Sequence, residues 1–156
     1  MIFKHLSDKF YADYPSDEYP EMMLKEKRPY TQVITEVNGL KFAIPLRSGI
    51  SHNADVLWTN KQQKCGLDFT KAILILDDSY INNEEKVFIR QNEYKHLLGK
   101  ERRVKEKMEK CIENYIAAKN DFSKEHNKQY CGFSTLQYFE EYIQTESDDE
   151  TKDVTE

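Results

Sequence analysis

Glycine is scarce in this chain, with five glycines among 156 residues, and none of them belongs to a glycine-rich phosphate loop. The sequence holds neither a G-x-G-x-x-G fingerprint nor a Walker A motif, which disfavours dinucleotide binding and P-loop phosphate chemistry. No G-x-S-x-G segment surrounds Ser48, so the nucleophile elbow of an α/β-hydrolase is missing as well. These absences exclude the enzyme classes that depend on such loops.

Cysteine is equally rare, since Cys65, Cys111 and Cys131 are odd in number and far apart. No C-x-x-C pair or Cys/His cluster has zinc spacing, and the histidines are scattered without carboxylates at ligand spacing. We therefore predict neither a disulfide framework nor a metal site, and we expect no cofactor. Unpaired thiols favour a reducing compartment, so the expected location is the cytoplasm. No apolar run reaches membrane-spanning length, and no membrane partner is expected.

The formal net charge of −5 is concentrated at the C-terminus. Residues 145–156 hold six of the 28 acidic residues and one of the 23 basic residues, which leaves 22 of each in residues 1–144. A segment this charged and this poor in apolar residues is typical of disorder. The length suits one domain with its own core. We predict a single domain over residues 1–144 and an acidic disordered tail over residues 145–156.

A β-hairpin is the clearest local pattern. Apolar and polar residues alternate over residues 32–37, and Asn38-Gly39 follows, the pair that favours a two-residue type I′ turn. The return strand is expected over residues 40–46, with Pro45 marking its end or an edge position. Further short strands are expected over residues 1–7, 56–58 and 72–76, with a weaker one over residues 86–89.

The later part of the chain has helical spacing, after one brief helix that Ser7 is expected to cap near the N-terminus. A helix over residues 93–98 is interrupted at Gly99, and a last helix is expected to begin at Ser134. The apolar stripe of the long helix between them is Val104, Met108, Cys111, Ile112, Tyr115 and Ile116. In the last helix the residues expected to face inward are Leu136, Phe139, Tyr142 and Ile143. Strands followed by helices predict an α+β fold, with helices packed on a mainly antiparallel sheet.

Several polar residues follow the return strand directly, among them Arg47, Ser48 and His52, with no acidic residue before Asp55. RNA carries its own nucleophile, because the ribose 2′-OH can attack the neighbouring phosphate without a metal. That reaction needs proton transfer near neutral pH, which suits histidine, and a cation on the phosphate, which suits arginine. A missing acid fits this chemistry, since a carboxylate would repel the phosphate. A histidine after a strand is also often structural, so the residues alone leave both readings open.

A basic segment offers a surface for RNA. Residues 94–110 hold seven Lys/Arg against three Glu, and basic and aromatic side chains together suit single-stranded RNA. A helix face of mixed Lys and Glu is also the usual solvated surface. Trp58 is either a core residue or a stacking platform. The other candidate RNA contacts are Lys25, Lys27, Arg90, Lys95, Lys100, Arg102 and Arg103.

The segment over residues 27–52 resembles the ToxN/AbiQ family of type III toxin–antitoxin endoribonucleases. The shared features are a basic residue opening a strand (KRPYTQVITEV), a tight NG turn, and a strand (LKFAIPL) ending in a hydroxyl-bearing loop (RSGISH). The start, IFKHLSDKFYADY, resembles the family's first strand and tyrosine-bearing segment, and YCGFSTLQYFEEY resembles its closing helix start. These blocks follow the family's order and extend to about residue 143.

The resemblance implies a compact, strongly twisted antiparallel sheet flanked by helices. It implies a metal-independent endoribonuclease that cuts cellular or phage RNA and leaves a 2′,3′-cyclic phosphate. It also implies an inhibitor, a repeated pseudoknot RNA that the toxin itself processes. Toxin and antitoxin RNA would then close into a ring-like protein–RNA assembly.

The resemblance also implies roles for residues at matching positions. Ser48 matches the loop serine, a hydrogen-bond donor to the scissile phosphate, and Arg28 matches the basic residue that opens the second strand. Tyr11 or Tyr14 supplies the family's early tyrosine, although Phe10 is the most literal match.

The loop after the return strand departs from the family. Members have Thr before the serine and Lys soon after it, whereas this chain has Arg47 and Ile50 there, so Arg47 is expected to supply the phosphate charge. His52 resembles the histidine of the CptN/TenpN-like branch and is expected to act as general base or general acid. The predicted catalytic set is His52, Ser48, Arg47, Arg28 and Tyr11.

Two other functions remain open on the sequence. In the first, the chain is a non-catalytic module that binds single-stranded RNA with its basic and aromatic side chains. In the second, it is an interaction protein with no RNA role. Only the last predicts no salt-dependent affinity for RNA.

Overall fold

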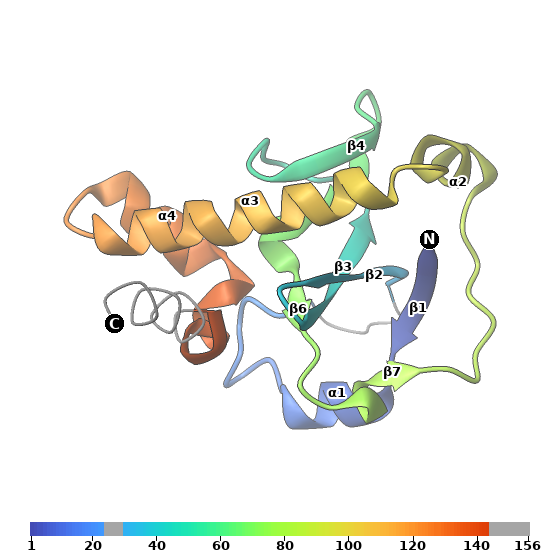
Figure 1. Ribbon diagram of the computed structural model, residues 1–156, viewed down its shortest axis with the longest axis horizontal. Coiled ribbons are helices and arrows are strands. Elements are labelled where there is room, and N and C mark those ends of the chain that lie inside the picture. Colours follow the sequence, from blue (N-terminus) through green and yellow to red (C-terminus); the bar gives the residue numbers. More distant parts are fainter. Residues whose placement is uncertain (24–29, 144–156) are drawn as a thin grey trace, which may run out of the picture.

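The computed structural model describes residues 1–23 and 30–143. Seven strands form one open antiparallel sheet in the order β4-β5-β3-β2-β1-β7, with β6 also paired to β3. This arrangement, with helices around it, confirms the predicted α+β fold (Figure 1). The strands are β1 (Ile2–Leu6), β2 (Gln32–Val37), β3 (Leu40–Arg47), β4 (Val56–Asn60), β5 (Cys65–Asp68), β6 (Ile73–Leu74) and β7 (Ile81–Asn82). The α-helices are α1 (Asp8–Asp13), α2 (Gln91–Leu97), α3 (Glu101–Asn120) and α4 (Glu125–Phe133).

The hairpin of β2 and β3 forms as predicted. Asn38 and Gly39 have φ angles of 52° and 80°, the positive values that a type I′ turn requires. Pro45 does not end the strand, because β3 continues to Arg47. On the side away from β2, β3 pairs first with β6 and then with β5. Pro45, which has no N–H to donate, lies in the gap between these two partners.

Short strands account for most of the differences from prediction. The strand expected over residues 72–76 is reduced to β6. The one expected over residues 86–89 is wrong, because that segment pairs with no strand among the described residues. There Thr31 donates its hydroxyl to the carbonyl of Phe88. The prediction missed β5 and β7, which are only four and two residues long. Such segments carry too few residues for alternation to show.

The helical predictions hold in the middle of the chain and are borne out in part near its end, where Leu136, Phe139 and Ile143 are buried as predicted. The Ser7 hydroxyl caps α1 by accepting from Phe10 N, and Gly99, at φ 77°, separates α2 from α3. Helix α4 was not predicted. Ser134 caps a short 3₁₀ turn, η3 (Thr135–Tyr138), and the α-helical turn at residues 140–143 follows it. Tyr142 does not face inward, because 39% of it is exposed.

One apolar core joins the sheet to the helices. Helix α3 lies across the sheet in Figure 1 and packs against β2, α4 and the 3₁₀ turn η1 (Phe69–Lys71). Fully burying a large apolar side chain contributes about 1.5–3 kcal/mol. Within residues 1–23 and 30–143, no helix combines the length and apolarity needed to cross a membrane. The largest side chains below 2% exposure include Phe10, Phe42, Phe69, Met108, Tyr115 and Phe139.

We predict that Gly66→Ala destabilises the sheet. A Cβ at Gly66 in β5 would lie 2.5 Å from the carbonyl oxygen of Leu57, which is backbone and cannot rotate away. The expected loss in free energy of unfolding is about 1–3 kcal/mol, measured by urea titration. Gly132→Ala is the matched control, because nothing lies within 4 Å of the new methyl group in α4 and alanine favours helix. Equal stability of the two variants would contradict the close approach of β4 and β5.

Candidate functional site

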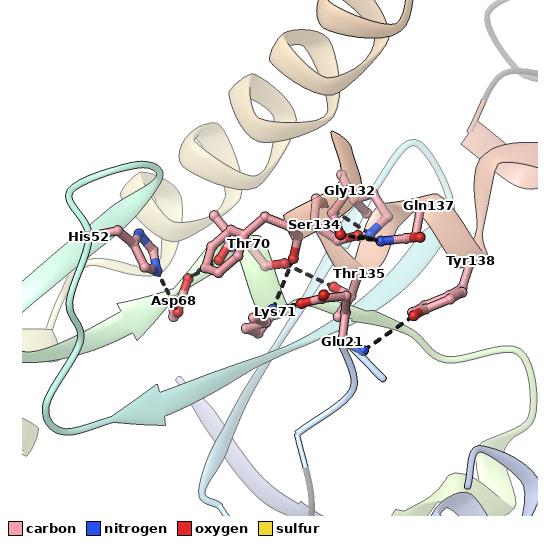
Figure 2. A network of polar contacts seen from close by, with 12 residues as sticks. Glu21, His52, Asp68, Thr70, Lys71, Gly132, Ser134, Thr135, Gln137 and Tyr138 are labelled. Atoms are coloured by element: carbon pink, nitrogen blue, oxygen red, sulfur yellow. Dashed lines mark hydrogen bonds and ion pairs between the residues drawn. The ribbon is translucent and has the colours of Figure 1, made fainter. Parts of the chain in front are cut away.

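Arg47, His52 and Asp68 meet where β3 and β5 pair. The Arg47 Nη1 lies 2.6 Å from Asp68 Oδ2, and His52 Nε2 lies 3.1 Å from the same oxygen (Figure 2 shows the histidine contact). The Asp68 side chain is completely buried, while 22% of Arg47 and 19% of His52 are exposed. One buried carboxylate therefore holds both of the strongest sequence candidates.

The loop after β3 folds back to bring His52 to this carboxylate. Gly49 has a φ of 69°, which favours glycine, and Ile50 N then donates to the carbonyl of Lys64 at 3.0 Å. Ile50 itself is buried, with 1% exposed. The positive φ of Gly49 and the hydrogen bond from Ile50 to Lys64 together reverse the chain within a few residues. Ile50 therefore anchors the loop through its buried side chain and its backbone hydrogen bond. It stands where members of the ToxN/AbiQ family have a lysine.

Asp68 is satisfied on both oxygens. Its Oδ1 accepts from Thr70 N at 3.0 Å and from Thr70 Oγ1 at 2.5 Å, which caps η1. The expectation that no acid lies at the site is wrong, because β5 supplies one from a distant part of the chain. Asp68 is compatible with an anionic ligand since the Arg47 guanidinium offsets its charge. Hydrogen bonds between charged groups of this kind are the stronger ones in proteins.

His52 is oriented by its two neighbours. A neutral imidazole that donates Nε2–H to Asp68 leaves Nδ1 as an acceptor, and that tautomer is assigned from the contact. Nδ1 is shielded from solvent and has no hydrogen-bond partner within the described part of the chain. The ring meets Phe133 edge-on, with centroids 4.9 Å apart and planes at 82°. The Nδ1 atom of His52 is thus buried and able to accept a hydrogen bond.

Lys71 fixes Phe133 next to His52. Its Nζ lies 4.1 Å from the centroid of the Phe133 ring and donates to the Phe133 carbonyl at 2.9 Å and to Glu21 Oε2 at 2.8 Å. Thr135 Oγ1 donates to the carbonyl oxygens of Thr70 and Ala72, so η3 is bonded to η1 (Figure 2). The end of α4 is therefore locked against the turn that follows Asp68.

Sequence reasoning missed Asp68, Thr70, Lys71 and Phe133. A usable signal was present in GLDFTKAILIL, where single Asp and Lys residues stand inside an apolar run. A charged residue in such a run is buried only when it is paired. The ionisable partners, Arg47 and His52 for Asp68 and Glu21 for Lys71, are more than ten residues away in sequence. The signal therefore identifies the buried charges and not their partners.

Ser48 is exposed and opens onto a hollow of about 170 Å³ beside Arg47. Arg90, a predicted RNA contact, reaches the same hollow from the residue before α2. The structure thus brings Arg90 to the adjacent pair Arg47 and Ser48, although more than forty residues separate Arg90 from that pair in the sequence. The lining residues are Thr31, Leu46, Arg47, Ser48, Phe88, Ile89, Arg90 and Glu93.

Tyr11, another predicted catalytic residue, lies elsewhere. Tyr11 packs edge-on against Phe10, and its contacts in the described part of the chain do not include Arg47, Ser48 or His52. Burial, with smaller effects of Tyr30 and Asp8, raises the pKa of Tyr11 to about 12. The phenol therefore stays protonated at neutral pH. Arg28, Lys25 and Lys27 lie outside the described residues.

The other predicted RNA contacts surround α2 and the start of α3. Trp58 is half-buried and lines a hollow of about 480 Å³ with Asn92 and His96 of α2. Helix α2 therefore lies between this hollow and the one beside Arg47. Lys95, Arg102 and Arg103 are exposed and Lys100 is half-buried. Arg102 is 91% exposed and forms an ion pair with Glu106 at 2.9 Å.

A second carboxylate, Asp55, ties the helices to the loop before β4. It accepts hydrogen bonds from the Tyr130 hydroxyl and the Asn114 amide, and from the Cys111 thiol at 3.7 Å. Burial raises the pKa of both Tyr130 and Cys111, and Asp55 raises each further. This cluster joins α3 and α4 to the sheet. In the described ranges no three His, Cys, Asp or Glu side chains are grouped so as to hold a metal ion.

Comparison of the chain with models of protein families, with curated proteins and with solved structures gave no match. The fold and the site are therefore defined by their own geometry. The molecule is an α+β protein with an open antiparallel sheet, and an Arg–Asp–His cluster lies where β3 and β5 meet. The resemblance to ToxN/AbiQ toxins stays a prediction.

We predict that Asp68→Asn destabilises the protein. The substitution leaves the partly buried Arg47 guanidinium without its counter-charge, and the expected loss is about 3 kcal/mol, near the lower end for a broken buried pair. Asp78→Asn is the matched control, because Asp78 is 88% exposed in its pair with Lys41 and should cost less than about 1 kcal/mol. Thermal and urea unfolding measure both. Similar losses in the two variants would contradict the central place of Asp68.

Proposed function

We propose that the chain is a metal-independent endoribonuclease of the type III toxin class. The observation that carries the proposal is the joint fixation of Arg47 and His52 by Asp68, directly beside the exposed hydroxyl of Ser48. This combination supplies a cation at the end of β3, and a hydrogen-bond donor and a proton-transfer group in the loop that follows. RNA needs no further nucleophile, because the 2′-OH belongs to the substrate.

His52 acts as general base in this proposal. Its Nδ1 takes the proton of the 2′-OH while the 2′-oxygen bonds to the adjacent phosphorus. The bond from phosphorus to the 5′-oxygen breaks, and that oxygen takes a proton from water. The products are a 2′,3′-cyclic phosphate and a 5′-hydroxyl end, and the imidazolium returns its proton to solvent. Asp68 stabilises the imidazolium while it exists.

Arg47 and Ser48 act on the phosphate. One guanidinium nitrogen of Arg47 is engaged by Asp68, and the group has further N–H donors in its planar fork. These donors and the Ser48 hydroxyl stabilise the extra negative charge on the pentacoordinate phosphorus. RNA must also open the loop at residues 48–55, because His52 Nδ1 has no solvent contact before it binds.

A repeated pseudoknot RNA is the proposed inhibitor, processed by the toxin and closed with it into a protein–RNA assembly. The exposed basic residues of α2 and of the first turn of α3 support this, since α2 borders the Arg47 hollow and α3 begins shortly after α2 ends. Lys95, Arg102 and Arg103 are the proposed contacts there. Cellular or phage RNA is the proposed substrate, and the cytoplasm the proposed location.

A binding module without catalysis is the second candidate, and one observation favours it. The free nitrogen of His52 is shielded between the loop and Phe133, as in a histidine that only supports structure. Such a protein would hold single-stranded RNA at its basic surface and leave it intact.

We predict that His52→Ala lowers RNA cleavage by about 10²–10⁴-fold, the usual cost of removing an acid–base group. The rate is measured with purified protein and RNA in EDTA. His126→Ala is the matched control, because His126 is exposed on α4 and distant in sequence from the loop. The His52 variant should also lose growth arrest while retaining its RNA affinity. Full activity of that variant would remove His52 from the mechanism, and intact RNA with wild-type protein would support the binding module.

We predict that the double charge reversal Arg102→Glu, Arg103→Glu weakens binding of the antitoxin RNA more than it slows cleavage of an unstructured RNA. Both side chains are exposed at the start of α3 and distant in sequence from the loop of His52. The salt dependence of affinity should fall by about one unit of slope for each lost phosphate contact. Equal losses of binding and cleavage, or no loss of either, would contradict the assignment.

A further inference from the structure

Phe88 is the most exposed large apolar side chain in the described part of the protein, at 79%. It lines the hollow that Arg47 and Ser48 also line. Its backbone is held, because the Thr31 hydroxyl donates to the Phe88 carbonyl at 3.1 Å. A fixed backbone with an exposed aromatic ring is a suitable platform for stacking a nucleic-acid base.

Cationic and hydroxyl groups line the same hollow as the Phe88 ring. Arg47 and Arg90 line the hollow from β3 and from the start of α2, and 61% of the Arg90 side chain is exposed. Ser48 adds a hydroxyl donor. A nucleotide whose base lies on Phe88 would therefore find phosphate-binding groups on two sides. The volume of about 170 Å³ suits a single base and not a folded RNA element.

Glu93 is the unusual member of this hollow. Its side chain is only 9% exposed, although it carries a carboxylate. Among residues 1–23 and 30–143, its ion-pair partner is Arg90 at 3.8 Å, a distance longer than a hydrogen bond. A nearly buried carboxylate normally accepts several hydrogen bonds, so Glu93 retains acceptor capacity toward the hollow.

We propose that the hollow between β3 and α2 binds one unpaired guanine nucleotide of RNA, with the base stacked on Phe88 and read by Glu93. Guanine alone among the four bases presents two adjacent N–H groups, N1–H and N2–H, that match the two oxygens of a carboxylate. The inference rests on the proposed function, because it places the guanine next to the phosphate held by Arg47 and Ser48. The hollow would then be the subsite that determines which base the ribonuclease recognises.

The test is equilibrium binding of short single strands that the protein cannot cut. Fluorescence anisotropy in EDTA measures the affinity of 2′-O-methyl RNAs about six nucleotides long, within the usual site size of such proteins. The strands carry one guanine, inosine or adenine in a uridine background. Inosine keeps N1–H and lacks the 2-amino group, so it should bind between the other two.

Substitutions at Phe88 and at Glu93 separate base stacking from base recognition. Phe88→Ala should lose about 5- to 100-fold in affinity for every strand, and Phe88→Trp should restore it. Glu93→Gln should lower the preference for guanine over adenine by about 10- to 100-fold with little change in the affinity for adenine. Phe122→Ala is the matched control, since Phe122 is an exposed aromatic residue that lies outside the hollow. Circular dichroism confirms that each variant is folded.

The outcomes distinguish this inference from the proposed function. Cleavage of ordinary RNA together with unchanged affinity and base preference in the Phe88 and Glu93 variants would overturn the guanine subsite alone. Guanine-selective binding by a protein that leaves ordinary RNA intact would overturn the ribonuclease and support the subsite. No binding of any strand would overturn the subsite.

Discussion

The buried carboxylate of Asp68 is the contact on which the rest of the site depends. It holds Arg47 from the end of β3, His52 from the following loop and Thr70 from η1, and so connects three successive parts of the chain. Burying a carboxylate is costly unless charge and hydrogen bonds compensate it, and here both do. The same contact keeps the loop folded and orients the imidazole. Asp68 therefore has a structural role and, in the proposed ribonuclease, a chemical role as well.

Two rigid segments border this cluster. On one side Lys71 locks Phe133 and the end of α4 beside His52. On the other side α2 contributes Arg90 and Glu93 to the hollow that Ser48 opens onto. The loop of residues 48–55 lies between them and carries exposed polar side chains. A rigid frame around a short loop is the arrangement that positions reacting groups while allowing a substrate to enter.

Local sequence predicted the parts of the fold that local forces determine. The Asn38-Gly39 turn, the Ser7 cap and the α3 stripe follow from short-range preferences, and the structure has all three. The missed elements, β5, β7 and α4, are short and are stabilised by their partners. For the same reason the sequence indicated Arg47 and His52 as candidates but not Asp68. Which buried acid meets a loop is decided by strand pairing, and a single sequence does not encode that pairing in any local pattern.

The central claim is that this site promotes attack of a ribose 2′-OH on its neighbouring phosphate. The most direct measurement is mass spectrometry of the products after incubation in EDTA, with a paired substrate that carries a single 2′-deoxyribose at the main cleavage position. We expect 2′,3′-cyclic phosphate ends on the ordinary RNA and no cut at the deoxy position. Cleavage at that position, or 3′-hydroxyl ends with 5′-phosphates, would contradict it.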